Sequence, residues 1–304
     1  MPDAGLQAVL PTLVERLGPV TGEPVALEGG ITNRNFRVGF GDVDYVVRIV
    51  GKNTGLLGID RDAERRATEA AASVGVGPAV GTFVADHECL VTRFISGRPI
   101  TAEDLRDPAT LAQVAASLRA VHGGPELPVA FSPFRIVEDY PATAVAHGAT
   151  IPRAYDACAR IATRIEAAFQ GPEHAPVPCH NDLLTANFID DGERIRIIDW
   201  EYAGMGDRFF DLGNLSINNG LGPADDERLI EAYFQEPATP SRVGSLRLMR
   251  IMSDFREAMW GVLQSGVSTL DIDYDAYAGE HFDRLRSSAA DPGFDRWLQD
   301  AHGH

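Results

Sequence analysis

Cysteine is scarce in this sequence of 304 residues, and long apolar runs and an excess of positive charge are missing. Its three cysteines, Cys89, Cys158 and Cys179, are too few and too scattered for a disulfide framework or a paired-cysteine metal site. No apolar run approaches the ~20 residues that span a bilayer, and the first residues lack the basic segment and apolar core of a signal peptide. We therefore expect a reduced, cytoplasmic setting and no membrane partner.

Positive charge is scarce relative to negative charge. The 27 Lys and Arg residues face 44 Asp and Glu residues, so the formal net charge is −17. Such a surface repels the phosphates of nucleic acids, and we expect no nucleic-acid partner. The charge favours a cationic small molecule as partner, although acidic surfaces also simply keep proteins soluble.

Internal repeats and low-complexity tracts are absent as well, and the residue pattern changes once along the chain. Up to about residue 95, short β-branched and aromatic runs alternate with glycine-containing turns, which predicts an antiparallel meander. One Ala-rich helix is expected between Asp60 and about Gly75. The predicted strands are 25–28, 35–40, 43–50, 79–85 and 89–95.

Beyond Gly97 the pattern becomes helical, with one exception. The exception is a hairpin with strands at 187–190 and 194–199, joined by the turn Asp191-Gly192. We therefore predict an α+β chain with a small β-rich lobe at 1–95 and a larger, mainly helical lobe at 96–304. The predicted helices of the larger lobe are 101–122, 153–170, 207–218, 225–235, 241–265 and 274–287.

The polar loop Cys179-His180-Asn181-Asp182 is the most informative segment, together with Asn187 and, at the end of an apolar run, Asp199. Kinases need these groups at this spacing: one carboxylate faces the acceptor hydroxyl, and an Asn and an Asp hold Mg²⁺ on the nucleotide phosphates. We predict Asp182 as the catalytic residue, and Asn187 and Asp199 as Mg²⁺ ligands. The alternatives are local, since Asp182 could form an Asx-turn and Asp199 could cap a following helix.

With its flanking motifs, this loop resembles the choline/ethanolamine kinase branch of the aminoglycoside-phosphotransferase-like and protein-kinase-like superfamily. The other matching segments are Gly29 to Asn33, Tyr45 to Gly51, Ile59-Asp60-Arg61 with Glu64, Ile198 to Tyr202, Gly206 to Asn214, and Ser253 to Ala278. The resemblance implies a bilobal protein-kinase-like fold. It also implies transfer of the γ-phosphate of ATP, with Mg²⁺, to the hydroxyl of a choline- or ethanolamine-like alcohol.

The resemblance also assigns residues to the nucleotide, which the lobe at 1–95 would bind. Arg48 would contact the α- and β-phosphates while an ion pair with Glu64 holds it. Lys52 and Glu69 are competing candidates for this ion pair. The full set of predicted nucleotide-binding residues is Gly29, Gly30, Thr32, Asn33, Arg48, Glu64, Thr92 and Phe94.

Several neighbours of the central loop are interpreted as structural rather than catalytic. The resemblance implies that His180 holds the loop and that Asp211 braces it. Asp207 is expected to cap the helix that follows it. The lobe at 96–304 would thus carry both catalysis and acceptor binding.

An acceptor site is predicted from one face of the helix at 241–265, on which Glu257 and Trp260 lie together. An aromatic ring beside a carboxylate favours an ammonium group. The alternative is that Trp260 belongs to the core and Glu257 is solvated. The predicted acceptor-binding residues are Tyr202, Glu257, Trp260, Tyr274 and Tyr277.

Two departures from the family pattern leave the acceptor open. Choline kinases usually carry a second tryptophan where this chain has Glu257, and a polar residue is often found where it has Leu184. A primary or secondary amine, or another amino alcohol, could therefore replace choline.

Other functions stay open too. They are an aminoglycoside phosphotransferase, a kinase of another small alcohol such as a thiamine-type kinase, and a pseudokinase that binds without turnover. The antibiotic branch normally has Gly in place of Asn181. The presence of Asp182, Asn187 and Asp199 together disfavours the pseudokinase. Both a monomer and a dimer are compatible with the sequence.

Overall fold

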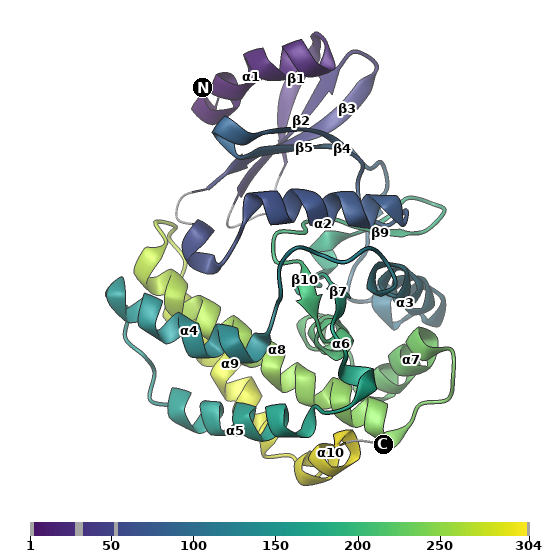
Figure 1. The fold of residues 1–304 in the computed structure, drawn as a ribbon, viewed down its shortest axis with the longest axis vertical. Helices are drawn as coiled ribbons and strands as arrows, with labels where there is room; N and C mark the ends of the chain where they lie inside the picture. Colours follow the sequence, from purple (N-terminus) through teal and green to yellow (C-terminus); the bar gives the residue numbers. More distant parts are fainter. Residues whose placement is uncertain (1–2, 28–32, 52–53, 303–304) are drawn as a thin grey trace.

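A computed structural model describes residues 3–27, 33–51 and 54–302. It has a small lobe built on one sheet and a larger helical lobe, with the helix α2 between them (Figure 1). Gly29, Gly30 and Thr32, predicted for the phosphate loop, lie outside the described residues, and so does Lys52.

The small lobe is a five-stranded antiparallel sheet with the strand order β1-β2-β3-β5-β4. Strands β1 (Val20–Leu27), β2 (Asn33–Phe40) and β3 (Val43–Val50) form the predicted meander, although β1 begins earlier than expected. Strand β5 (Cys89–Arg93) pairs with β3 on one side and with β4 (Val80–Val84) on the other. The sheet therefore brings β3 next to the strand that leads into the larger lobe.

An unpredicted helix, α1 (Ala4–Leu17), packs on this sheet. The Asp3 side chain accepts a hydrogen bond from a backbone N–H of the first turn, which caps the helix. Leu6, Val9 and Leu13 are buried and form a separate small core with side chains of the sheet. The prediction of strands and turns here was wrong, because these residues recur at helical spacing.

Helix α2 (Arg61–Ser73) lies between the two lobes (Figure 1). Asp60 caps it, as predicted, by accepting backbone hydrogen bonds from its first turn. The small side chains of Ala67 and Ala71 pack into the large core of the helical lobe. A lobe boundary at residue 95 stays a prediction, since α2 precedes it in sequence and shares this core. The helix carries Glu64 to the interface between the lobes.

The larger lobe is built around the long helix α8 (Pro240–Val267), which packs against α4, α6, α9 and α10. The other helices of this lobe are α3 (Pro108–His122), α4 (Pro133–Ala146), α5 (Tyr155–Ala168), α6 (Arg208–Asn218), α7 (Pro223–Phe234), α9 (Tyr274–Ala289) and α10 (Phe294–Ala301). Helices α4 and α10 were not predicted. The first contains Pro141, which reads as a helix breaker, and the second is short.

Two small sheets present the central polar loop. Strands β8 (Phe188–Asp190) and β9 (Ile195–Ile197) form the predicted hairpin, and β6 (Arg98–Pro99) pairs with β8. Before the loop, β7 (Val177–Cys179) pairs with β10 (Gly204–Gly206), a sheet that was not predicted. The loop is therefore fixed by a strand at each end.

Short 3₁₀ turns occupy Thr54–Leu57, Ala85–His87, Asp104–Arg106, Pro172–His174 and Thr185–Asn187. The predicted fold class, a small β-rich lobe and a larger, mainly helical lobe, is confirmed. No helix within the described residues is long and apolar enough to cross a bilayer.

Candidate active site

A cavity of about 220 Å³ lies between the sheet of the small lobe and the hairpin of the large one. Leu27, Val46 and Leu90 give it apolar walls. Thr92 and Phe94, both predicted to bind the nucleotide, also line it. Its polar lining consists mainly of Asn35, Arg48, Glu64, Arg93, Asn187 and Asp199.

Arg48 stands at the polar end of this cavity between two carboxylates. It forms the predicted ion pair with Glu64, and its Nη1 also lies 2.7 Å from Asp199 Oδ1. Burial alone would lower the pKa of Arg48, but Asp199, Glu64 and Glu201 outweigh it and raise the pKa. The guanidinium is therefore permanently charged, and Glu69, the competing partner, instead pairs with Arg65 on the surface of α2.

A second buried arginine, Arg61, links the lobes. Its Nη1 lies 2.6 Å from Glu64 Oε2 and 3.0 Å from Glu201 Oε2, and its Nη2 donates to Asn33 Oδ1 at 2.9 Å. The amide of Asn33 in turn donates to Glu201 at 2.8 Å. Asn33, predicted to bind the nucleotide, is thus held in a network across the lobes. Arg61 and Glu201 stand inside the matching motifs, but no role was predicted for either of them.

The central polar loop is held by Asp211, which is completely buried on α6. Its carboxylate accepts hydrogen bonds from the backbone N–H of His180 at 2.8 Å and of Asn181 at 2.6 Å. His122 Nε2 lies 3.0 Å from the same carboxylate. Asn181 has a positive φ of 68°, which is strained for a non-glycine residue and needs such support. The geometry agrees with the predicted bracing role of Asp211.

Asn187 and Asp199, the predicted Mg²⁺ ligands, lie beside each other at the open end of the hairpin. The backbone N–H of Ile198 donates to the Asn187 carbonyl at 2.9 Å, and both predicted ligands line the cavity. The Asn187 Nδ2 donates to the Asp182 carbonyl at 2.8 Å, which leaves its Oδ1 for another partner. Asp199 Oδ1 is buried and, among the described residues, has only the ion pair with Arg48. This set of oxygen donors fits Mg²⁺.

Asp182 follows directly in the braced loop, with 18% of its side chain exposed. Burial raises the pKa of its carboxyl to about 7, against the opposing effect of Arg256. Among the described residues, its carboxylate accepts no backbone hydrogen bond, so the structure does not show an Asx-turn. Asp199 likewise caps no helix, since α6 is capped by Asp207.

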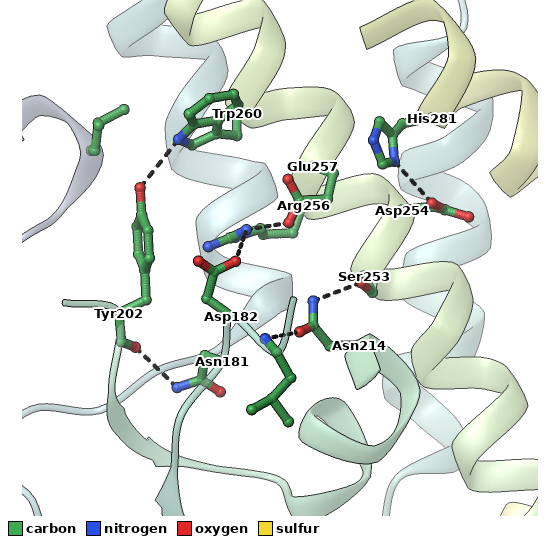
Figure 2. A network of polar contacts seen from close by, with 12 residues as sticks. Asn181, Asp182, Tyr202, Asn214, Ser253, Asp254, Arg256, Glu257, Trp260 and His281 are labelled. Atoms are coloured by element: carbon green, nitrogen blue, oxygen red, sulfur yellow. Dashed lines mark hydrogen bonds and ion pairs between the residues drawn. The ribbon is translucent and has the colours of Figure 1, made fainter. Parts of the chain in front are cut away.

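The five predicted acceptor residues form one connected cluster, and Figure 2 shows three of them, Tyr202, Glu257 and Trp260, near Asp182. Trp260 Nε1 donates to the Tyr202 hydroxyl at 3.1 Å, as Figure 2 shows, and the Tyr277 hydroxyl donates to Glu257 Oε2 at 2.7 Å. The Trp260 ring lies edge-on to Tyr274 and Tyr277, with centroids 5.9 and 5.7 Å away. The alternative interpretation is half right: Trp260 is buried and belongs to the large core, whereas Glu257 is buried and not solvated.

Arg256 is the one residue of this cluster that was not predicted from the sequence. Its Nη1 lies 3.6 Å from Asp182 Oδ1 and is paired with Glu257, while its guanidinium lies 4.5 Å over the Tyr202 ring. The sequence held one signal: Arg256 stands directly beside Glu257, inside the matching segment Ser253 to Ala278. The predicted acceptor face runs through Glu257 and Trp260, and Arg256 lies one position outside it.

Comparisons with known proteins identify the family of this chain. Residues 24–246 match the phosphotransferase enzyme family. A probable ethanolamine kinase of Arabidopsis thaliana is 26% identical over 286 residues, which cover 83% of this chain and 75% of the relative. The crystal structure of a choline/ethanolamine kinase family protein from Mesorhizobium loti has a TM-score of 0.82 and 33% identity, and the match covers 98% of this chain and 97% of that one.

More distantly related aminoglycoside phosphotransferases have a similar fold. A mutant of aminoglycoside phosphotransferase APH(4)-Ia, in a ternary complex with AMP-PNP and hygromycin B, has a TM-score of 0.65 and 22% identity. That match covers 93% of this chain and 99% of the other, and it shows a shared protein-kinase-like fold. The resemblance seen in the sequence motifs is thereby confirmed. The chain belongs to the phosphotransferase enzyme family and, within it, to the choline/ethanolamine kinases, which makes it a small-molecule kinase acting on an alcohol group.

Proposed function

We propose that this enzyme transfers the γ-phosphate of ATP, with Mg²⁺, to the hydroxyl of a choline- or ethanolamine-like amino alcohol. One observation carries the proposal. Asp182 stands between the polar end of the interlobe cavity, with Asn187 and Asp199, and the aromatic cluster around Trp260. A phosphoryl donor on one side and a cationic alcohol on the other would meet at its carboxylate.

The interlobe cavity is the proposed nucleotide site. Its apolar walls suit an adenine ring, next to Thr92 and Phe94. Arg48, held by Glu64, would donate paired hydrogen bonds from its guanidinium to the phosphate oxygens. The AMP-PNP in the related aminoglycoside phosphotransferase supports a nucleotide in this fold. Gly29, Gly30 and Thr32 remain predicted contacts of the phosphates.

Asn187 Oδ1 and the Asp199 carboxylate would hold the metal ion. Bound Mg²⁺ would neutralise charge on the transferring phosphoryl group and its neighbours. Asp199 forms an ion pair with Arg48, and Asp199 and Arg48 both line the same cavity. The chain's own contribution is to hold these groups in place through the hairpin and through α2.

Asp182 would orient the acceptor hydroxyl and accept its proton. A pKa raised to about 7 by burial makes its carboxylate a stronger base than an ordinary aspartate. General base catalysis of this kind contributes roughly 10²–10⁴ in rate. The bracing of the loop by Asp211 keeps the carboxylate near the position that this role requires.

The aromatic cluster would bind the ammonium group of the acceptor. Contact of a cation with the faces of Trp260 and the tyrosines is worth about 0.5–2 kcal/mol. Glu257, predicted to attract the ammonium directly, has both oxygens engaged, one by Arg256 and one by Tyr277. Glu257 would therefore attract the ammonium group from behind the aromatic rings and would not contact it directly.

A coupled assay of ADP release over a panel of alcohols tests the proposal. The panel contains ethanolamine, N-methylethanolamine, choline, thiamine and aminoglycosides, including hygromycin B. We expect the highest kcat/KM for one of the first three. Turnover of aminoglycosides or thiamine but of no simple amino alcohol would refute the proposed acceptor. Binding of Mg-ATP without phosphate transfer to any of them would identify a pseudokinase.

A further inference from the structure

We propose that Arg256 is a positioning residue of this active site, which holds the Asp182 carboxylate in place while Glu257 and the Tyr202 ring hold Arg256. This inference rests on the proposed function, because it takes Asp182 as the group that orients the acceptor hydroxyl. Arg256 itself would touch neither nucleotide nor acceptor.

The contacts converge on one guanidinium (Figure 2). Its Nη1 is shared between Asp182 Oδ1, 3.6 Å away, and the Glu257 carboxylate, as the dashed lines of Figure 2 show. Its Cζ lies 4.5 Å from the centre of the Tyr202 ring. The Tyr202 backbone carbonyl accepts a hydrogen bond from Asn181 Nδ2 at 3.0 Å, so the ring under the guanidinium is tied to the catalytic loop itself. Arg256 thus meets the loop at two points.

The burial of Arg256 argues for a role in the site rather than in stability. Only 2% of the residue is exposed, and Nε and Nη2 have no hydrogen-bond partner within the described part of the chain. A buried cation with unpaired N–H groups destabilises a fold, and an apolar side chain of similar volume would not. What the arginine supplies is a fixed positive charge next to Asp182.

Arg250, earlier on the same helix, shows the contrast. Its Nη1 lies 2.8 Å from Asp226 Oδ2 and donates to Ser216 Oγ at 2.9 Å and to the Leu221 carbonyl at 3.1 Å. This ion pair joins α8 to α7 and lies among structural residues. The same helix therefore carries one arginine whose partners are structural and one whose partners form the active site.

The planar fork of arginine matters for the proposed role. The Arg256 guanidinium contacts the Tyr202 ring, Asp182 and Glu257 at the same time, and a lysine would keep the charge without the planar fork. Misplacing a catalytic group by about 1 Å can cost about 10²-fold in rate. Loss of Arg256 should therefore lower kcat and leave nucleotide binding intact, because Arg256 is not among the described residues that line the interlobe cavity.

The experiment compares Arg256→Met, Arg256→Lys and the matched control Arg250→Met, each alone, and Arg256→Met combined with Asp182→Asn. We measure kcat, the KM for ATP and for the best acceptor, and the urea midpoint of unfolding. Since Arg256→Met leaves Glu257 buried without its partner, the double variant Arg256→Met with Glu257→Gln repeats the comparison in a protein without that unpaired charge.

We expect Arg256→Met to lower kcat about 10- to 100-fold with an unchanged KM for ATP, and Arg256→Lys to recover part of this loss. Arg250→Met should lower the urea midpoint and leave kcat within about twofold of wild type. In the Asp182→Asn background, Arg256→Met should slow the enzyme no further, because the two residues act as a unit.

Three results would overturn the inference. They are an equal loss of kcat in Arg250→Met, a change confined to the KM for ATP, and a full additional loss from Arg256→Met in the Asp182→Asn background. A wild-type enzyme that phosphorylates no amino alcohol refutes the proposed function instead. The Arg256 comparison is then made on the acceptor that the enzyme does use.

Discussion

Removing the Asp211 carboxylate tests how the catalytic loop is held. In Asp211→Ala, the backbone N–H groups of His180 and Asn181 lose acceptors that lie 2.8 and 2.6 Å away. His122 Nε2 loses a partner at 3.0 Å. Asp211 is completely buried, so bulk water cannot take its place without a change in the core.

The expected effect is large. Each buried polar group left without a partner costs about 1–3 kcal/mol, so three such groups cost roughly 3–6 kcal/mol if the loop relaxes in part. A typical domain has only about 5–15 kcal/mol of unfolding free energy. We therefore expect a clear fall in the urea midpoint, measured by circular dichroism. We also expect kcat to fall at least about 10-fold in the fraction that folds, because Asp182 directly follows the released backbone.

Asp207→Ala is the matched control. Asp207 lies on the same segment, where it caps α6 by accepting the Phe209 N–H at 2.8 Å and contacts His174 at 2.8 Å. Loss of a cap costs about 0.5–2 kcal/mol, and this residue does not support the catalytic loop. Equal losses of stability in the two variants, or an unchanged kcat in Asp211→Ala, would show that other contacts hold the loop.

Three further substitutions separate the proposed roles. Asp182→Ala should lower kcat by about 10² or more and leave the Kd for ATP, measured by calorimetry, nearly unchanged. A similar loss of kcat and of ATP affinity would contradict the role of Asp182 as the catalytic base. Asp199→Ala should reduce the affinity for ATP with Mg²⁺ to that measured in EDTA, whereas Asp190→Ala, on the neighbouring strand of the hairpin, should not. Trp260→Ala should raise the KM for the amino alcohol about 2- to 30-fold at constant KM for ATP. A change in the KM for ATP alone would refute the assignment of the aromatic cluster to the acceptor.

The parts of the site that could be predicted from the sequence are those set by local pattern. The loop to Asp182, the hairpin and Asp199 are close in sequence, and a turn fixes their relation. The shared face of Glu257 and Trp260 follows from helical spacing alone. These residues do lie together, because strand and helix geometry leaves few alternatives once the elements form.

The parts of the site that were not predicted depend on contacts between segments that are far apart in the sequence. Arg256 differs from Glu257 by one position on a helix, and only the packing of α8 behind the loop decides that Arg256 meets Asp182 as well as Glu257. Arg61 forms an ion pair with Glu201 across the two lobes, and the residues around neither partner predict this pairing. Helix α1 was missed although its apolar residues have helical spacing, and Pro11 within it weakens the local signal.

The distribution of charge explains how a chain with net charge −17 can serve an anionic nucleotide. Its cations at the site are buried arginines, Arg48 and Arg61 near the cavity and Arg256 near the acceptor cluster, and each is paired with carboxylates. Burial keeps these charges from being screened by solvent and salt. In the proposed function, the acidic surface attracts the cationic acceptor, while Arg48 and the metal ligands receive the phosphates at short range. Local pairing, rather than net charge, therefore decides what each half of the site binds.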